Sequence, residues 1–302
     1  MGQFTPEVSV TFVGAATLDA IALVNQFPQA DERLVAEEIA YAGGGPAATA
    51  AVAAARLGVA AGFVGAVGDD AEGEQIVNGL LAEGVDISGM TVMSGRRSGA
   101  SIAVVDRGRG TRAICTRPGP PIELSAEATA RILDAEWVHV DHVGWAPLSD
   151  LLARAGRRPR LSVDGGNPIP GFTPKDVDLY APTLDALVRE YGEQRPGELL
   201  AAALAAGARC VVATRGAEGS LAATRDGERH EAVAFPTEVL STLGAGDVFH
   251  GALLAALVRG LPLSACLSYA NVVAALSCRG LDGRSAIPTH VEATKHVPAL
   301  AS

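Results

Sequence analysis

The chain has 302 residues, of which 48% are hydrophobic and 19% charged, so it can bury a large core. Its net charge of −10 argues against sequence-independent binding to nucleic acid, which relies on Lys and Arg to neutralise phosphates. No apolar run reaches about twenty residues, so we expect no membrane span. These features favour a soluble protein with small-molecule substrates.

The N-terminal residues 1–6 lack a charged start followed by a long apolar run, so we expect no signal peptide. The four cysteines, Cys115, Cys210, Cys266 and Cys278, include no C-x-x-C pair. They are expected to be reduced thiols, and the expected location is the cytoplasm.

Strands and helices alternate in the first part of the chain. The predicted elements are a strand over 8–13, extended segments within 20–42, a helix over 46–57, a strand over 62–67 and a helix over about 72–82. The first strand ends at Gly14, and Gly58 ends the alanine-rich helix.

A β-hairpin is predicted next, with strands over 100–106 and 111–116 around a turn at 107–110. After Pro121 the alternation resumes, with strands over 137–141, 160–164 and 209–214. This pattern predicts an α/β fold in which helices cover both faces of a mainly parallel sheet.

We expect a single domain over residues 1–302, with a small β lid formed by about 20–42 and 92–118. Ligands bind at the carboxyl ends of parallel strands. Four residues fall at such ends: Gly14, Gly65, Asp164 and Thr214.

The segment Ser241–Gly251 is the most informative motif. Its glycines precede an apolar helix, and Asp247 lies in the predicted first turn. Backbone N–H groups at a helix start attract anions, and glycine lets a phosphate approach them closely. An aspartate there makes sense as a base that takes a proton from an attacking hydroxyl, although it could also be a simple helix cap.

A second glycine-rich block spans Gly43–Gly58, with Pro46 at the first helical position. Its spacing is not G-x-G-x-x-G, which argues against a dinucleotide site. The block could bring backbone N–H groups against a polyhydroxylated ligand, or it could serve close helix packing alone.

Together these motifs resemble the ribokinase-like (PfkB) family of carbohydrate kinases, over nearly the whole chain from Gly14 to about Pro288. The blocks 43–58 and 244–251 and the tail 274–288 look most like the sulfofructose kinase branch. The resemblance implies a ribokinase-like α/β fold, ATP with Mg²⁺, and in some members a homodimer formed through the lid.

The resemblance also implies roles for individual residues. Asp247 matches the catalytic base, and Gly244, Ala245 and Gly246 match the anion hole that steadies the transferring phosphoryl group. Asp19 matches the sugar-hydroxyl ligand, although it could instead cap a local turn.

The other matching positions divide between two ligands. The sugar side comprises Gly44, Gly45 and Thr49, with Arg33, Arg112, Thr116 and Arg117 in the lid as candidates for an anionic sugar substituent, or simply as solvated polar residues. The nucleotide side comprises Thr214, Gly216, Gly219 and Asn271, which could otherwise be a β-turn and a surface helix residue.

Three departures from the family pattern stand out. Ser241 replaces an aspartate that usually helps to hold a monovalent cation, which leaves potassium activation open. Residues 183–186 keep neither key residue of the N-x-x-E stretch linked to magnesium, so we assign no protein ligand to the metal. Thr116 and the segment 143–144 stand where the branch has its sulfonate-binding asparagine and arginine.

The predicted function is ATP-dependent phosphorylation of a primary hydroxyl on a ketose or modified hexose, such as fructose, sulfofructose or a sugar phosphate. One alternative is a nucleoside kinase on the same fold. The other is a sugar- or nucleotide-binding sensor without turnover, which the departures at Ser241 and 183–186 motivate.

Overall fold

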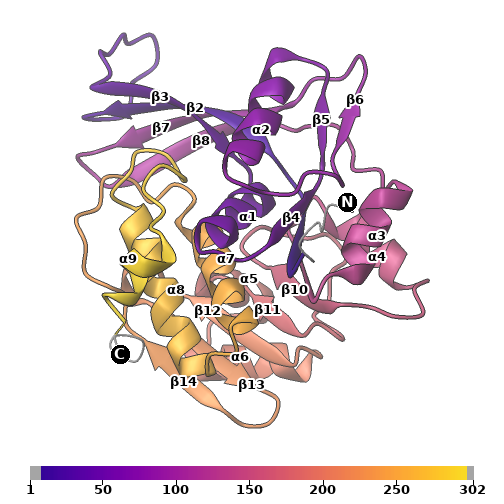
Figure 1. The fold of residues 1–302 in the computed structure, drawn as a ribbon. Helices are drawn as coiled ribbons and strands as arrows, with labels where there is room; N and C mark the ends of the chain where they lie inside the picture. The colour runs from indigo at the N-terminus through magenta and orange to yellow at the C-terminus, as the bar shows by residue number, and fades with distance from the viewer. Residues whose placement is uncertain (1–7, 298–302) are drawn as a thin grey trace.

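The computed structural model describes residues 8–297 (Figure 1). The prediction that residues 1–6 hold no signal peptide lies outside this range. Among the described helices, none combines the length and apolar character that crossing a membrane requires.

An eight-stranded sheet forms the centre of the fold, in the order β14-β13-β12-β11-β10-β9-β1-β4. Its strands are β1 (Val10–Val13), β4 (Ala61–Val64), β9 (Trp137–Val140), β10 (Arg160–Asp164), β11 (Leu179–Ala181), β12 (Cys210–Thr214), β13 (Ser220–Thr224) and β14 (Arg229–Ala232). Six neighbouring strands run parallel: β4, β1, β9, β10, β11 and β12. Strands β13 and β14 add antiparallel pairings at the β12 edge. The prediction of a mainly parallel sheet is confirmed.

Helices cover both faces of this sheet, as predicted. One face carries α1 (Pro46–Arg56), α2 (Ala71–Ala82), α7 (Ala245–Val258), α8 (Leu263–Ser277) and the short α9 (His290–Thr294). The other carries α3 (Ala126–Asp134), α4 (Trp145–Leu152), α5 (Leu184–Tyr191) and α6 (Pro196–Ala205). Alternate residues of β1 divide between the two cores, with Phe12 in the first and Val13 in the second.

Helices α1 and α7 pack closely because small residues line their contact. Ala50 and its alanine neighbours are buried, and a side chain at Gly251 would collide with the Ala50 carbonyl. The alanine-rich sequence of 46–57 therefore serves helix packing, and both helices are held side by side in the core (Figure 1).

A separate four-stranded sheet has the order β3-β2-β7-β8 and lies above the central sheet in Figure 1. Its strands are β2 (Thr17–Val24), β3 (Glu38–Gly44), β7 (Gly99–Asp106) and β8 (Thr111–Arg117). The predicted hairpin is confirmed as β7 and β8. Only the two ends of the predicted extended segment 20–42 are strands, and residues 25–37 between them form none.

Two sequence predictions next to this sheet differ from the structure. The strand predicted over 62–67 breaks at Gly65 into β4 and β5 (Ala66–Gly68), and β5 pairs with β6 (Thr91–Met93) in a sheet of two strands. A side chain at Gly65 would collide with the ring of Phe63 and the carbonyl of Gly14. Only glycine therefore fits where the chain passes this close to β1. The predicted lid segment 92–118 begins within β6. Because β6 pairs with β5, only the part of this segment from β7 onward belongs to the four-stranded sheet.

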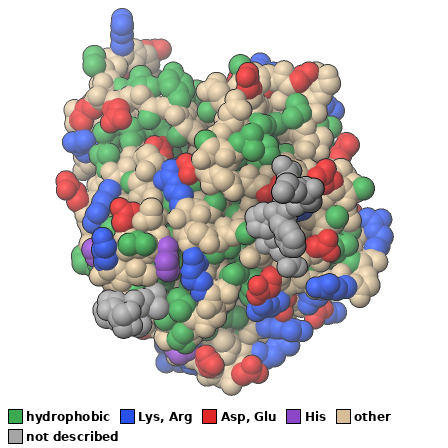
Figure 2. Space-filling view, viewed as in Figure 1, with side chains coloured by type: hydrophobic (Ala, Val, Ile, Leu, Met, Phe, Trp, Pro, Cys, Tyr) green, Lys and Arg blue, Asp and Glu red, His purple; other side chains and the backbone are tan. Residues whose placement is uncertain are grey.

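The two faces of the small sheet differ in their surroundings. Ile21, Leu23 and Val105 point inward and pack against Leu240 and Leu281. The outer face leaves Ile39, Tyr41 and Ile102 exposed at 61%, 73% and 61%. Figure 2 shows hydrophobic side chains gathered over this region of the surface.

Candidate functional site

A cleft of about 450 Å³ brings the predicted nucleotide residues together. Thr214, Gly216, Gly219 and Asn271 all line it, together with Ala245 and Gly246 at the start of α7. The remaining wall is largely apolar and includes Phe235 and Ala274, as an adenine ring would require. Two segments far apart in the sequence thus meet around one cavity.

The loop from β12 needs its glycines. Gly216, which opens the short helix η1 (Gly216–Glu218), has a φ of 55°, and Gly219 has a φ of 99°. A side chain at Gly219 would also collide with the Ala232 carbonyl. The loop is therefore fixed in a shape that other residues adopt only with strain.

Asn271 is buried in α8, so the alternative that it is a surface residue is wrong. Its Nδ2 donates to the carbonyls of Ala232 and Val233 at 2.9 and 3.1 Å. These bonds tie α8 to the end of β14, and they shape the wall of the cleft.

Helix α7 begins with exposed backbone donors. Gly244 precedes it with a φ of 72°, and among the described residues the amides of Gly246 and Asp247 have no backbone acceptor. A Cβ placed at Gly246 would meet nothing within 4 Å, so there is open space beside this residue. In residues 8–297 the Asp247 carboxylate accepts no hydrogen bond from the backbone of α7, so it does not act as a cap of this helix.

Asp247 lies among other acids. Ligand atoms of Asp164, Asp247 and His250 lie within 4.8 Å of one another. Burial, and then the negative charges of Asp164 and Asp141, raise the pKa of Asp247 well above its usual range, although Arg112 and Arg284 oppose this shift. A carboxylate that holds a proton more tightly is a stronger base when ionised.

Asp141 links three segments at the end of β9. Its Oδ2 accepts from the amides of Ala15 and Ala47 at 2.8 and 3.2 Å, and its Oδ1 accepts from Val143 and Gly144 at 2.8 and 3.0 Å. Burial raises the pKa of Asp141 despite these bonds. This carboxylate holds the start of α1 against the ends of β1 and β9.

Asp19 lies on the inner face of the small sheet, beside the glycines that precede α1. It accepts hydrogen bonds from Thr17 Oγ1 at 2.7 Å and from Ser101 Oγ. A side chain at Gly44 would collide with the Asp19 carboxylate. The predicted pair of Asp19 and Gly44 is therefore brought together.

The other predicted sugar-site residues, Gly45, Thr49 and Thr116, lie in three different surroundings. Gly45 has a φ of 90° and packs against the Ala15 carbonyl, so backbone geometry alone explains this glycine. Thr49 is buried, and its Oγ1 accepts from Arg284 Nε at 3.2 Å. Thr116 pairs with Ser101, which pairs with Asp19, so the three share one face of the sheet.

The structure places Arg117 away from the other predicted sugar residues. Arg117 pairs with Ala100 and therefore points to the face opposite Thr116 and Asp19. Its guanidinium donates to the Ser98 carbonyl and to Glu72 of α2.

Arg33 is exposed in the segment between β2 and β3, and no contact in residues 8–297 tests its predicted role.

Arg112 connects the small sheet to the loop before α7. Its Nη1 donates to Thr242 Oγ1 at 2.7 Å, and Thr242 also lines the nucleotide cleft.

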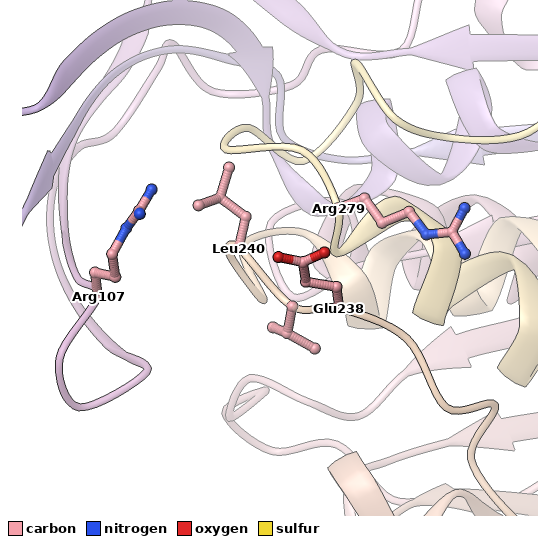
Figure 3. A pocket seen from close by; sticks show the side chains of 5 residues that line it. Arg107, Glu238, Leu240 and Arg279 are labelled. Carbon is pink, nitrogen blue, oxygen red and sulfur yellow. The ribbon is translucent and has the colours of Figure 1, made fainter.

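A second cavity, of about 690 Å³, opens between Arg107 and the segment 238–240 (Figure 3). In Figure 3 Arg107 faces Leu240 and Glu238 across this opening, with Arg279 behind them.

Several functional candidates were not assigned from the sequence. From the sequence, Asp164 is predicted only to end a strand and Asp141 only to belong to one. His250 and Arg284 lie within the motif segments 241–251 and 274–288 without a predicted role. The ends of parallel strands were the available signal for both aspartates. No sequence signal pointed to Arg284.

Comparisons with known proteins agree with this geometry. The model of the "pfkB family carbohydrate kinase" matches residues 8–151 and 174–290. Ribokinase of Bacillus subtilis (strain 168) is 27% identical over 288 residues, covering 94% of this chain and 97% of its own.

Solved structures share the whole fold. A crystal structure from Agrobacterium tumefaciens with a provisional ribokinase assignment is 30% identical, with a TM-score of 0.85 and coverage of 97% of this chain and 98% of its own. Arabidopsis thaliana ribokinase, complexed with ribose and ATP, is 23% identical, with a TM-score of 0.84 and coverage of 97% and 99%.

The fold and the site thus define a ribokinase-like α/β protein with a cleft of nucleotide size beside an acidic centre. The chain belongs to the pfkB family of carbohydrate kinases, and it is an ATP-dependent carbohydrate kinase.

Proposed function

We propose that this kinase transfers the γ-phosphoryl group of ATP to a primary hydroxyl of a ketose or modified hexose. One observation carries the proposal: the Asp247 carboxylate lies in the first turn of α7, next to Gly246, which lines the nucleotide cleft and whose amide has no backbone acceptor in residues 8–297. A base and an anion site are thereby placed next to each other.

The catalytic steps follow from this placement. Asp19 and Gly44 hold the sugar, and Asp247 takes the proton from the attacking hydroxyl. The anion hole consists of the amides of Gly244, Ala245 and Gly246, and the positive end of α7 stabilises the transferring phosphoryl group there. In residues 8–297 the Gly244 and Gly246 amides have no backbone acceptor, whereas the Ala245 amide exchanges its 3.3 Å bond to the Thr242 carbonyl for one to the phosphoryl group. Most of the rate comes from positioning and electrostatics, as in other phosphoryl transfers.

Mg²⁺ fits the residues present. Carboxylate oxygens are the protein ligands that Mg²⁺ prefers, and imidazole nitrogen is not typical for it. Asp164 would therefore hold the ion, whereas His250 would not. When bound beside the phosphates, Mg²⁺ neutralises part of their charge.

A sugar is favoured over a nucleoside by the lid strands. The one aromatic residue in β2, β3, β7 and β8 is Tyr41, and it lies on the outer face. The inner face offers aliphatic side chains such as Ile21 and Val105, which give a nucleobase no stacking partner. Sulfofructose stays a candidate because the motif blocks resemble that branch.

A substrate panel tests the proposal. ADP release should depend on a sugar when fructose, fructose 6-phosphate, sulfofructose and adenosine are compared. Turnover with adenosine alone would support the nucleoside kinase instead. Calorimetric binding of a sugar with no ADP release would support the sensor.

We also propose that the small sheet closes over the sugar as a lid and pairs two copies into a homodimer. The support is the exposed apolar outer face with Ile39, Tyr41 and Ile102. Burial of such a patch favours association.

The double variant Tyr41→Asp with Ile102→Asp should therefore sediment as a monomer, because it places two charges in the apolar face. The exposed Val291 of α9 offers a matched control, and Val291→Asp should leave the dimer intact. A wild-type protein that sediments as a monomer would contradict the dimer.

The presence of Ser241 predicts that the activity of this kinase does not depend on K⁺. The residue is buried, and its Oγ accepts from the Leu243 amide at 3.1 Å, so a neutral hydroxyl stands where most relatives have a carboxylate. Because hard cations favour carboxylate oxygens, replacing K⁺ by tetramethylammonium should change kcat/KM by less than about twofold. A large loss of activity without K⁺ would contradict this.

We propose the cytoplasm as the place of action, where ATP is supplied. All four cysteines are free in the structure, as a reducing compartment would leave them.

A further inference from the structure

Arg284 is a buried cation without a counterion. It lies in the loop after α8, and only 7% of its surface is exposed. Its Nε donates to Thr49 Oγ1 at 3.2 Å and its Nη2 donates to the Gly44 carbonyl at 2.8 Å. Both acceptors are neutral, and within residues 8–297 no carboxylate lies at ion-pair distance and no acceptor faces Nη1.

Two other partly buried arginines of this chain, Arg56 and Arg215, form ion pairs with glutamates. Arg56 Nη2 lies 2.5 Å from Glu83, and Arg215 Nη2 lies 2.5 Å from Glu231. A guanidinium removed from water without an anion costs several kcal/mol, on the order of the penalty for any buried unpaired ion. Burial lowers the pKa of Arg284 to about 10 even though Asp19 and Asp247 favour its charged form.

The guanidinium lies at the predicted sugar site. A side chain at Gly43 would collide with Arg284 Nη1, and a side chain at Gly44 would collide with the Asp19 carboxylate. Arg284 and Asp19 thus approach the same two glycines.

The backbone of Arg284 is fixed before any ligand arrives. Its amide donates to Asp282 Oδ1 at 2.6 Å, and its carbonyl accepts from Arg56 Nη1 at 2.5 Å. With the Nε hydrogen and one Nη2 hydrogen also engaged, three N–H groups remain, both on Nη1 and the second on Nη2, and their directions are preorganised.

We propose that Arg284 binds an oxyanion substituent, phosphate or sulfonate, on the sugar substrate, so that this kinase selects anionic sugars over neutral ones. The inference rests on the proposed function because it concerns the same sugar site. A neutral hydroxyl could accept from Nη1 as well, but it would leave the buried charge uncompensated. An oxyanion supplies both an acceptor and the missing charge.

Calorimetry in the absence of ATP tests this directly. The wild type should bind fructose 6-phosphate or sulfofructose at least roughly tenfold more tightly than fructose, because charge-assisted hydrogen bonds are the strong ones. Arg284→Met should lose this preference, so that its affinities for fructose and for the anionic sugars agree within a few-fold. Comparison of the two anionic sugars shows which oxyanion the site accepts.

Arg284→Lys guards against a folding defect, since it keeps the charge and should retain part of the preference. Arg229→Met, at an exposed arginine of β14, is the matched control and should behave as the wild type. Equal wild-type affinity for fructose and both anionic sugars would overturn the inference, as would a preference that survives in Arg284→Met.

The two proposals can fail separately. ATP-dependent turnover of fructose without any anion preference would leave the proposed function intact and overturn the role of Arg284. Turnover of adenosine with no sugar bound would overturn both.

Discussion

Replacing Asp247 by Asn is expected to lower kcat by roughly 10³-fold, within the range for loss of a general base. The amide keeps the shape of the carboxylate but cannot take a proton from the sugar hydroxyl. Because the nucleotide cleft is lined by other residues, ATP binding measured by calorimetry should change little. Coupled ADP release gives the rate.

The control for this variant is Asp150→Asn, at an exposed acid of α4, which should leave kcat unchanged. Near-normal turnover in Asp247→Asn would eliminate Asp247 as the base. It would return the motif to a purely structural role.

The same variant should melt at a higher temperature. The folded protein raises the pKa of Asp247 above its unfolded value, so ionised Asp247 destabilises the fold at neutral pH. This cost shrinks as the pH falls below the raised pKa, and it vanishes below the unfolded-state pKa, where the carboxyl is protonated in both states. The difference in Tm between variant and wild type should therefore shrink on acidification.

The largest expected effect on stability belongs to Asp141→Ala. The change removes the acceptor of four backbone N–H groups from three segments. Buried donors left unpaired cost about 1–3 kcal/mol each, so the free energy of unfolding should fall by roughly 3 kcal/mol or more. Urea denaturation measures the loss.

Asp141→Asn refines this prediction. Asparagine keeps one acceptor oxygen but places an amide NH₂ against two of the donors, so its loss should be smaller than that of alanine without vanishing. Asp185→Ala, at an exposed residue of α5, serves as the control. An Asp141→Ala protein as stable as the wild type would show that other groups hold these segments together.

Much of the fold could be predicted because its signals are local. Strands such as 8–13 and 160–164 are short apolar runs, and the alternation with helices indicates a parallel sheet. The same holds for the nucleotide residues, since the motif starting at Gly244 and the loop 214–219 each carry their own glycines. The structure then brings these two segments to one cleft.

Sequence patterns do not suffice where a long-range contact decides the outcome. Thr116 and Arg117 are neighbours on one strand, and only the register with β7 decides which of them faces Asp19. Arg284 stands in a polar segment of glycine, serine and aspartate that is typical of an exposed turn. It is buried against the end of β3 and the start of α1, where it donates to the Gly44 carbonyl and to Thr49, and no local pattern shows these contacts.

Asp141 illustrates the same limit. An aspartate after an apolar strand is visible in the sequence, but its partners come from segments near residues 15, 47 and 143. Their convergence exists only in the folded chain. Sequence patterns located the edge of the sheet where chemistry is expected, and tertiary contacts chose the side chains.

The central claim is that Asp247 and the amides at the start of α7 act on one phosphoryl group. The most direct measurement is a crystal structure with a non-hydrolysable ATP analogue and whichever sugar of the panel supports ADP release. The account predicts the terminal phosphate at the amides of residues 244–246 and a primary hydroxyl of the sugar in hydrogen-bond contact with Asp247. A terminal phosphate bound elsewhere, or a hydroxyl beyond the reach of Asp247, would contradict it.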